Sequence, residues 1–334
     1  MKILVTGGLG YIGSHTVVEL QNEGYEVFII DDLSNSKIEV LEQITSITGV
    51  KPHFEQFNLL EKSKVDSFFN TNKIDGVIHF AASKAVGESV EKPLLYYNNN
   101  IGSLLNVLMA MQNTKQDSLI FSSSCTVYGQ ADVMPITENA PRKDAESPYG
   151  NTKKIAEDIL TDTTKASDFN VIALRYFNPI GAHPSAKIGE LPIGVPQNLI
   201  PYVTQTAAGI RAELSVFGND YPTPDGTAVR DYIHVVDLAK AHIVALKRLL
   251  EKKNKTKMEF FNIGTGKGSS VLDVIKAFEK STKTKLNYKI VARRAGDITE
   301  AYADTTFANS ELGWKAEKTL EDALYDAWRW QLKQ

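Results

Sequence analysis

The segment 121–153 contains residue types that together could move a proton. Tyr149 and Lys153 are four positions apart at the start of an expected helix, so their side chains share one helix face. A phenol has a pKa of about 10 in water, and a fixed cation beside it favours the phenolate. The serine run 122–124 ends an apolar stretch typical of a buried parallel strand. We therefore predict that Tyr149 exchanges a proton with a substrate hydroxyl, that Lys153 lowers its pKa, and that Ser124 hydrogen-bonds the same oxygen.

A glycine-rich turn near the N-terminus supplies the context that a Tyr-x-x-x-Lys spacing needs, since that spacing also arises by chance in many helices. Gly7, Gly10 and Gly13 are spaced G-x-x-G-x-x-G between an apolar strand expected over 2–5 and a helical pattern. Such glycines permit a tight turn and close approach of the backbone to a pyrophosphate, while the helix N-terminus provides positive potential. The turn therefore predicts a dinucleotide site.

Acidic residues follow the second expected strand, 26–30, and indicate which dinucleotide binds. The carboxylates of Asp31 and Asp32 would accept hydrogen bonds from the adenosine ribose hydroxyls and repel a 2′-phosphate. The cofactor is therefore predicted to be NAD rather than NADP.

Strand and helix patterns alternate up to residue 175, which predicts an α/β fold with a Rossmann-type doubly wound parallel sheet. From Phe177 the chain becomes rich in Pro and Gly, and we place the main domain boundary there. The predicted domains are an NAD-binding domain over 1–177, rejoined by about 230–264, and a smaller C-terminal α/β substrate domain over 178–334. Further strands are expected over 51–57, 76–80, 171–175, 214–217 and 260–264, and helices over 93–111, 198–209 and 320–332. We interpret His79, His234 and Asp237 as packing residues.

Composition restricts the class of protein. The 334 residues carry 37 basic and 40 acidic side chains, a net charge of −3 that gives no support to a nucleic-acid or anionic-membrane partner. A single cysteine, Cys125, excludes an internal disulfide framework and suits a reducing compartment. The first apolar run stops at Thr6-Gly7-Gly8, too early for a signal peptide or a membrane span. We expect a cytoplasmic globular protein that needs no metal.

Several longer motifs resemble a known family. TGGLGYIGSH, Asp31, SSSCTVYG and YGNTK are similar to the extended short-chain dehydrogenase/reductase superfamily. HFAASKAVGESVEKPLLYY, RYFNPIGAHP, FGNDYPTPDGTAVRDYIHV and RRAGD resemble the UDP-glucose 4-epimerase (UDP-galactose 4-epimerase) family over nearly the whole length.

The resemblance implies reversible C4 epimerisation of UDP-glucose and UDP-galactose, in galactose and nucleotide-sugar metabolism. Tyr149 would take the proton of the sugar 4-hydroxyl while C4 gives a hydride to tightly held NAD, and the 4-keto sugar would then turn and receive hydride on its other face. The implied NAD contacts, with the glycine loop and the acidic strand end, are Gly7, Gly10, Tyr11, Ile12, Gly13, Asp31, Asp32, Asn35, Ser36, Asn58, Leu59, Phe80, Ala81, Lys84, Asn99 and Phe177. The implied UDP-sugar contacts, with Phe217 beside the uracil and the arginines on the diphosphate, are Thr126, Asn178, Asn198, Leu199, Phe217, Arg230, Arg294, Asp297 and Ala301.

The chain departs from the family pattern at two positions. Asn58 stands where the family commonly has an adenine-binding Asp. Ala301 stands where a bulky residue often lines the sugar pocket beside C2, and a small residue there implies acceptance of UDP-GlcNAc and UDP-GalNAc as well. The family also pairs the helix near 93–112 with the Tyr149 helix across a two-fold axis, so the resemblance implies a homodimer.

Two other functions are compatible with parts of the pattern. A sugar-nucleotide 4,6-dehydratase shares the fold, NAD and the Tyr/Lys pair, but it needs an Asp-Glu acid–base pair where this chain has Cys125 and Thr126. A non-catalytic dinucleotide-sensing protein would be free to lose Tyr149, Lys153 or Ser124, which are all present.

Overall fold

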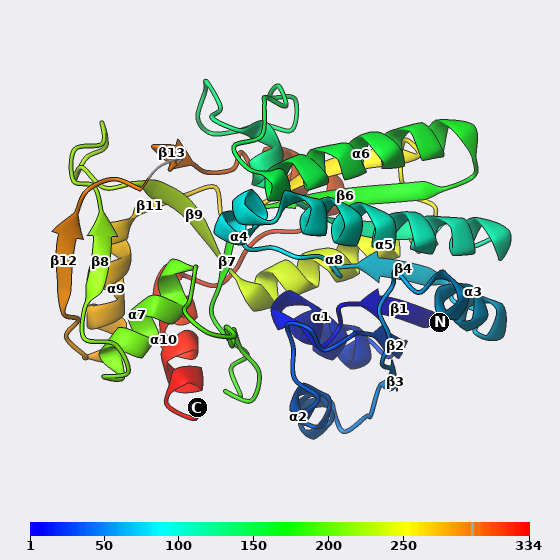
Figure 1. Ribbon diagram of the computed structural model, residues 1–334, viewed down its shortest axis with the longest axis horizontal. Coiled ribbons are helices and arrows are strands. Elements are labelled where there is room, and N and C mark those ends of the chain that lie inside the picture. Colours follow the sequence, from blue (N-terminus) through cyan, green and yellow to red (C-terminus); the bar gives the residue numbers. More distant parts are fainter. Residues whose placement is uncertain (295–296) are drawn as a thin grey trace.

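A seven-stranded parallel sheet organises the first domain in a computed structural model that describes residues 1–294 and 297–334 (Figure 1). The strand order is β10-β6-β5-β4-β1-β2-β3, so the connection reverses direction between β1 and β4. This is the order of a dinucleotide-binding sheet, and ligands bind such sheets outside the carboxyl ends of the strands at the reversal. The predicted fold class is confirmed. The strands are β1 (Lys2–Thr6), β2 (Glu26–Ile30), β3 (His53–Glu55), β4 (Gly76–His79), β5 (Ser118–Ser124), β6 (Asn170–Tyr176) and β10 (Met258–Ile263).

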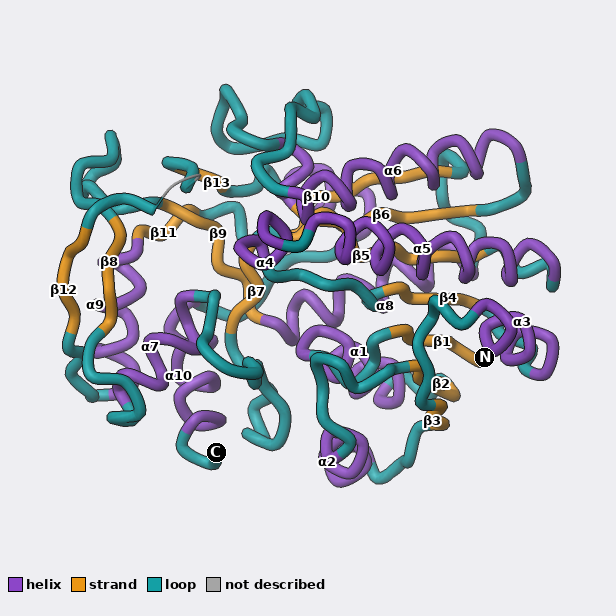
Figure 2. Tube along the Cα trace, in the orientation of Figure 1, coloured by secondary structure: helices purple, strands orange, loops and turns teal. Residues whose placement is uncertain are grey.

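Helices cover both faces of this sheet, which explains why its strands are apolar on both sides (Figures 1 and 2). In β1, Ile3 and Val5 pack into one core and Leu4 into the other. The first core is closed by α1 (Tyr11–Asn22), α2 (Glu39–Thr48) and α8 (Val235–Leu250). The other face carries α3 (Lys62–Thr71), α4 (Val86–Glu91), α5 (Pro93–Asn113) and α6 (Pro148–Ala166).

The second domain has its own core around short strands, at the left of Figure 1. Strand β9 pairs with β7, β11 and β13, while β8 pairs in parallel with β12. Helices α7 and α9 both pack against α10, and the three helices share one core with the strands. The elements are β7 (Asn178–Ile180), α7 (Leu199–Ala207), β8 (Leu214–Phe217), β9 (Val229–His234), β11 (Gly268–Ser270), α9 (Val271–Thr282), β12 (Tyr288–Val291), β13 (Glu300–Ala301), the π-helix η2 (Ala308–Leu312) and α10 (Leu320–Gln331).

The chain returns to the first sheet after β9. Helix α8 packs against α1, and β10 then adds to the edge of the sheet by pairing in parallel with β6. Expected and observed elements differ mainly at their ends: the strand expected over 51–57 is β3, only His53–Glu55.

Some features fall partly outside the described residues. Arg293, Arg294 and Asp297 of the RRAGD motif are described, whereas its Ala295 and Gly296 lie outside. Within residues 1–294 and 297–334, no helix combines the length and apolar character needed to cross a membrane.

Candidate active site

The predicted proton-transfer residues come from the carboxyl end of β5 and the first turns of α6. Ser124 ends β5 and begins the 3₁₀ helix η1 (Cys125–Tyr128), where its Oγ accepts from the Thr126 N–H at 3.2 Å. Ser147 caps α6 by accepting from the Gly150 N–H at 3.2 Å, and a proline follows it at the first helical position. The cap fixes where α6 begins, and so it places Tyr149 next to the end of β5.

Lys153 is buried and its Nζ has a fixed partner. It donates to the Ser122 carbonyl at 2.6 Å and lies 6.0 Å from the centroid of the Tyr149 ring. Burial lowers the pKa of Lys153 to about 8, while the charge of Glu157 opposes that shift. Lys153 therefore remains mostly cationic at pH 7.

Burial dominates at Tyr149 as well. It raises the pKa of Tyr149 to about 12, and the hydrogen bond from Ser124 only partly offsets it. In the chain alone the Lys153 ammonium is directed to the Ser122 carbonyl, and desolvation of the phenolate is the larger effect on the pKa of Tyr149. The lowering of this pKa by Lys153 stays a prediction for the site with its ligands bound. The phenol form is present at neutral pH.

The glycine turn between β1 and α1 forms a cradle whose close packing excludes side chains at Gly7 and Gly13. Gly7 has φ +69°, and a Cβ there would lie 2.9 Å from the Ala81 amide nitrogen. A Cβ on Gly13 would lie 2.2 Å from the Gly7 carbonyl oxygen. Gly10, the N-cap residue of α1, has no side chain to occupy the helix end. The turn thus leaves backbone amides and a positive helix end open to an anionic group, which fits a pyrophosphate.

The Asp31 carboxylate accepts three hydrogen bonds and can accept one more. Its Oδ1 accepts from the Leu33 N–H at 3.0 Å and the Ser36 Oγ at 2.7 Å, and its Oδ2 accepts from the Leu9 N–H at 3.1 Å. Burial raises the pKa of Asp31, and these hydrogen bonds lower it. A carboxylate offers about four acceptor positions, so one on Oδ2 remains for a ribose hydroxyl.

Asn58 has a clear structural effect on its neighbour. Its Nδ2 donates to Asp32 Oδ2 at 2.7 Å, and its Oδ1 accepts from the Leu60 N–H at 2.9 Å. An aspartate at this position would bring a second negative charge against Asp32. The amide replaces that repulsion with a hydrogen bond.

The other predicted cofactor residues lie at the same edge of the sheet. The Tyr11 hydroxyl donates to the Gly181 carbonyl at 2.7 Å, and Asn99 Nδ2 donates to Ser83 Oγ at 3.0 Å. Ile12 is the second residue of α1, Asn35 is exposed after β2, and Leu59 and Phe177 are buried. Phe80 and Ala81 directly follow β4.

Several of the predicted UDP-sugar residues lie on or beside β9. The Arg230 guanidinium donates to Asp297 at 2.6 Å and to the Val229 carbonyl at 2.8 Å. The Arg294 guanidinium lies 5.6 Å from the Phe217 ring centroid and 3.6 Å from Asp297. An aromatic ring and two guanidinium groups are thus adjacent, as recognition of a nucleoside diphosphate requires. Ala301 is the β13 partner of Arg230, and Asn178 lies on the neighbouring strand β7.

One carboxylate joins the two predicted ligand regions. Glu190 Oε1 accepts from Lys84 Nζ at 3.2 Å and from Asn198 Nδ2 at 2.6 Å. Asn198 is the N-cap residue of α7, and Leu199 is its first residue. The structure therefore places a predicted NAD contact beside a predicted UDP-sugar contact.

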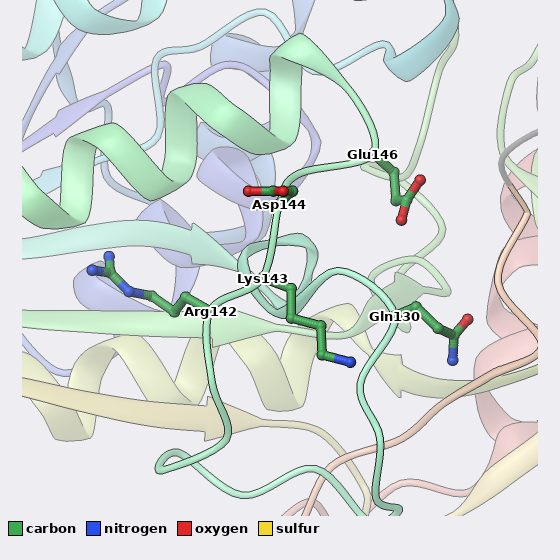
Figure 3. Close-up of a pocket in the computed structure, with 5 residues that line it drawn as sticks. All are labelled: Gln130, Arg142, Lys143, Asp144 and Glu146. Carbon is green, nitrogen blue, oxygen red and sulfur yellow. The ribbon is translucent and has the colours of Figure 1, made fainter.

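A depression elsewhere on the surface has no relation to these residues. This open hollow of about 480 Å³ lies on the loop before α6. Figure 3 shows the residues that line it, which are Gln130, Arg142, Lys143, Asp144 and Glu146. Two of its cations are already paired, Arg142 with Asp158 and Lys143 with Asp132. None of the predicted site residues is among those that line it.

Comparison with known proteins identifies the family. A family model described as GDP-mannose 4,6 dehydratase matches residues 4–327. The UDP-glucose 4-epimerase of Bacillus subtilis (strain 168) is 52% identical over 332 residues, 99% of this chain and 97% of that protein. The chain belongs to the UDP-glucose 4-epimerase family.

Solved epimerase structures agree with this assignment. UDP-glucose-4-epimerase from Stenotrophomonas maltophila with bound NAD and formylated UDP-arabinopyranose has a TM-score of 0.97 and 48% identity, covering 100% of this chain and 98% of that one. UDP-glucose 4-epimerase from Bifidobacterium longum in complex with NAD+ and UDP has a TM-score of 0.95 and 46% identity, with the same coverage. The resemblance inferred from the motifs is confirmed. Both epimerase structures hold NAD, the cofactor predicted from the glycine turn and Asp31.

Some residues near the epimerase site were not singled out from the sequence. Glu157 and Arg175 form a buried ion pair behind Lys153, with 2.8 Å between Arg175 Nη2 and Glu157 Oε2. The spacing of Tyr149, Lys153 and Glu157 at i, i+4 and i+8 was the signal available for it. Glu190 lies in a loop without periodicity, and its link to Lys84 spans 106 positions. No local pattern indicates that contact.

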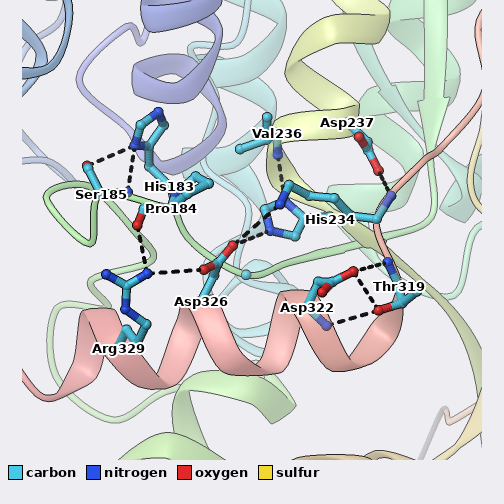
Figure 4. Close-up of polar contacts among 12 residues, drawn as sticks. His183, Pro184, Ser185, His234, Val236, Asp237, Thr319, Asp322, Asp326 and Arg329 are labelled. Atoms are coloured by element: carbon cyan, nitrogen blue, oxygen red, sulfur yellow. Dashed lines mark hydrogen bonds and ion pairs between the residues drawn. The ribbon is translucent and has the colours of Figure 1, made fainter. Parts of the chain in front are cut away.

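The residues interpreted as packing are buried. Two of them, His234 and Asp237, also accept hydrogen bonds from backbone N–H groups (Figure 4). His234 Nδ1 accepts from the Val236 N–H at 3.0 Å at the start of α8, and its Nε2 faces Asp326 at 3.2 Å. Asp237 accepts from the backbone of Glu317 and Lys318, at 3.0 and 2.8 Å. His79 is hydrogen-bonded to Thr6 Oγ1 at 2.9 Å, and burial lowers its pKa to about 3.

Proposed function

We propose that this protein is an NAD-dependent UDP-glucose 4-epimerase that reversibly inverts C4 of UDP-glucose and UDP-galactose. The observation that carries the proposal is the placement of Ser124, Tyr149 and Lys153 at the edge of the sheet where the glycine cradle opens. The family membership and the NAD held by similar epimerases support it.

The residues present fit NAD. The cradle of Gly7, Gly10 and Gly13 would hold the pyrophosphate, and Asp31 would receive the adenosine ribose. When bound, NAD supplies a hydride acceptor and a positive charge on its nicotinamide ring. In NADP a 2′-phosphate would lie beside the Asp31 carboxylate in place of the ribose hydroxyl, and the repulsion between the two negative charges disfavours that cofactor.

Tyr149 is proposed to move the proton. Its Oη would accept the proton of the sugar 4-hydroxyl and return it after C4 presents its other face, with Ser124 Oγ holding the same oxygen. Because burial raises the pKa of Tyr149 to about 12, the phenolate needs positive charge close by when ligands are present. Lys153, a buried cation held in a fixed position, would supply part of this positive charge.

The UDP part of the substrate would be held by the group around β9. Arg230 and Arg294 are proposed to bind the diphosphate, and Phe217 to contact the uracil. Asp297 holds Arg230 in place through its 2.6 Å hydrogen bond. Thr126 Oγ1 is buried without a hydrogen-bond partner among the described residues, so it is available to a sugar hydroxyl.

The description of the matching family model names a 4,6-dehydratase. This chain lacks the acid–base pair that such a reaction needs, because Cys125 and Thr126 stand at those positions. Burial raises the pKa of the Cys125 thiol to about 12, so it stays protonated at neutral pH. Thr126 has no titratable group in that range. The site therefore favours epimerisation over elimination.

The decisive experiment is to incubate the purified protein with UDP-galactose without added cofactor and to resolve the nucleotide sugars. We expect UDP-glucose to form until the two sugars reach equilibrium, and no dehydrated 4-keto-6-deoxy sugar. The Tyr325→Phe variant, which changes an exposed tyrosine on α10, should behave as the unmodified protein. Absence of UDP-glucose from a protein that retains its nucleotide would overturn the proposal.

We also propose that the site accepts UDP-GlcNAc and UDP-GalNAc, because Ala301 leaves room for an acetamido group. Ala301 is buried beside Val127 and Phe177. Neighbouring side chains on a strand point to opposite faces, and the Tyr302 ring lies against Gly268, where a Cβ would be 3.1 Å from its Cδ1. Tyr302 is thus directed away from the space beside Ala301.

The Ala301→Tyr variant tests this specificity. It should lose turnover of UDP-GalNAc and keep turnover of UDP-galactose, because a phenol would occupy the acetamido space. Tyr302→Phe is the matched control and should keep both activities. If the unmodified protein does not convert UDP-GalNAc while it converts UDP-galactose, the pocket argument is wrong.

A further inference from the structure

A carboxylate lies directly behind the predicted catalytic residues. Glu157 is fully buried on α6, one helical turn after Lys153. Its Oε1 accepts from Ser123 Oγ at 2.6 Å and from Arg175 Nε at 2.9 Å, while its Oε2 accepts from Arg175 Nη2 at 2.8 Å. A bidentate guanidinium and a short hydroxyl bond fix both carboxylate oxygens in one orientation.

These contacts attach α6 to the end of β5 at three consecutive serines. The Ser122 carbonyl accepts from Lys153, the Ser123 hydroxyl donates to Glu157, and Ser124 acts on the Tyr149 phenol, whose pKa it lowers. The middle contact is the one that involves no predicted catalytic residue. It nevertheless sets where the serines on either side of it lie relative to α6.

Glu157 is also the acidic group that acts on the Lys153 ammonium. Burial disfavours that charge and Glu157 opposes the effect, whereas His79, which faces Lys153 from β4, is uncharged above about pH 3. Other elements present further charges and titratable groups to these two residues. They are Arg175 from β6, Arg142 from the loop before α6, Tyr128 from η1 and Tyr149 from α6 itself.

We propose that Glu157 is a positioning residue for the reaction: its buried carboxylate fixes the serine end of β5 against α6 and supplies the negative charge that balances the Lys153 ammonium. The inference rests on the proposed function for its catalytic consequence. The charge balance itself is a property of the protein and can be measured without turnover.

The Glu157→Gln variant keeps the size of the side chain and removes its charge. Protein labelled with ¹³C at lysine Cε, with Lys153 assigned through Lys153→Arg, reports titration of this ammonium directly by NMR. We expect the midpoint, about pH 8 in the unmodified protein, to fall by on the order of one pH unit, a tenfold loss of proton affinity. The alkaline limb of kcat/KM for UDP-galactose should move to lower pH by the same amount.

Matched variants separate position from charge. Ser123→Ala removes one contact and keeps the carboxylate, so it should lower kcat with little change in KM or in the Lys153 midpoint. Asp158→Asn removes the next acidic charge on α6, which is half exposed and paired with Arg142, and should change neither quantity. If Glu157→Gln alone does not fold, the double variant Glu157→Gln/Arg175→Gln removes both charges together and should show a smaller fall of the midpoint, because loss of the Arg175 cation offsets part of the loss of the Glu157 carboxylate.

An unchanged Lys153 midpoint in folded Glu157→Gln or in the double variant would overturn the charge role. Unchanged kcat in Ser123→Ala would overturn the positioning role. If the midpoint falls as expected but no variant, nor the unmodified protein, converts UDP-galactose, the epimerase assignment fails and the charge balance stands.

Discussion

Replacing Lys153 by Met should stabilise the protein at neutral pH while removing its activity. Burial lowers the pKa of Lys153 from 10.5 to about 8. A shift of this size means that folding with a charged lysine costs about 3 kcal/mol at pH 7. Methionine keeps most of the apolar stem and carries no charge, so this cost disappears. The variant also loses the hydrogen bond to the Ser122 carbonyl, which reduces this gain in stability by about 2 kcal/mol because the donor is charged.

The stability difference between Lys153→Met and the unmodified protein should depend on pH. Between about pH 8 and pH 10.5 the unfolded chain holds a proton on Lys153 that the folded chain has lost, so the stability of the unmodified protein rises with pH in this window. The variant has no such rise. We therefore expect Lys153→Met to be more stable than the unmodified protein at pH 7, by an amount that falls by about 2.5 kcal/mol between pH 7 and pH 10.

Urea unfolding at the two pH values measures the difference. Both proteins should be stripped of nucleotide, since NAD bound to one of them would add its own stabilisation. Lys165→Met changes an exposed lysine on the same helix, and its difference from the unmodified protein should not depend on pH. A stability difference for Lys153→Met that is the same at pH 7 and pH 10 would refute the reasoning.

Three other perturbations have defined outcomes. Tyr149→Phe should retain NAD and UDP but lose a factor of about 10²–10⁴ in turnover, measured by product formation, and near-normal turnover would remove Tyr149 from its role. Gly13→Ala should abolish co-purification of NAD, measured by acid release, because its Cβ would lie 2.2 Å from a carbonyl oxygen; Gly87→Ala, where the nearest atom is 3.6 Å away, should not. Sedimentation at micromolar concentration should show a dimer, and Leu105→Glu on the exposed side of α5 should give a monomer, whereas a monomer in both proteins would contradict the proposed homodimer.

The fold was predictable because its signals are local. The glycine turn after 2–5, the acidic end of 26–30 and the alternation up to 175 indicate a doubly wound parallel sheet, and the predicted helix ends lie within about two residues of the observed ones. The helix expected over 198–209 is α7, Leu199–Ala207, with Asn198 as its N-cap residue. The short strand β3 was overestimated because its flanking residues resemble strand without pairing.

The electrostatics of the site were not predictable in the same way. Spacing shows that Tyr149 and Lys153 share a helix face, but not how deeply the phenol is buried or which acceptor the ammonium takes. Burial decides the pKa of Tyr149, and the Ser122 carbonyl decides the direction of Lys153. Glu190 likewise meets Lys84 and Asn198 only because the fold brings a distant loop to them.

The return of the chain to its first sheet has a consequence for synthesis on the ribosome. Strand β10 pairs with β6, yet it ends at Ile263 while β6 ends at Tyr176. At a translation rate of about 5–20 residues per second, β10 is completed roughly 4–17 s after β6, and the outer edge of β6 stays unpaired during that time. Helix α8, which covers one face of the same strands, is also delayed. For that time the nascent sheet exposes an unpaired edge and an apolar face, so the order of synthesis makes this protein a candidate for chaperone protection until residue 263 has emerged.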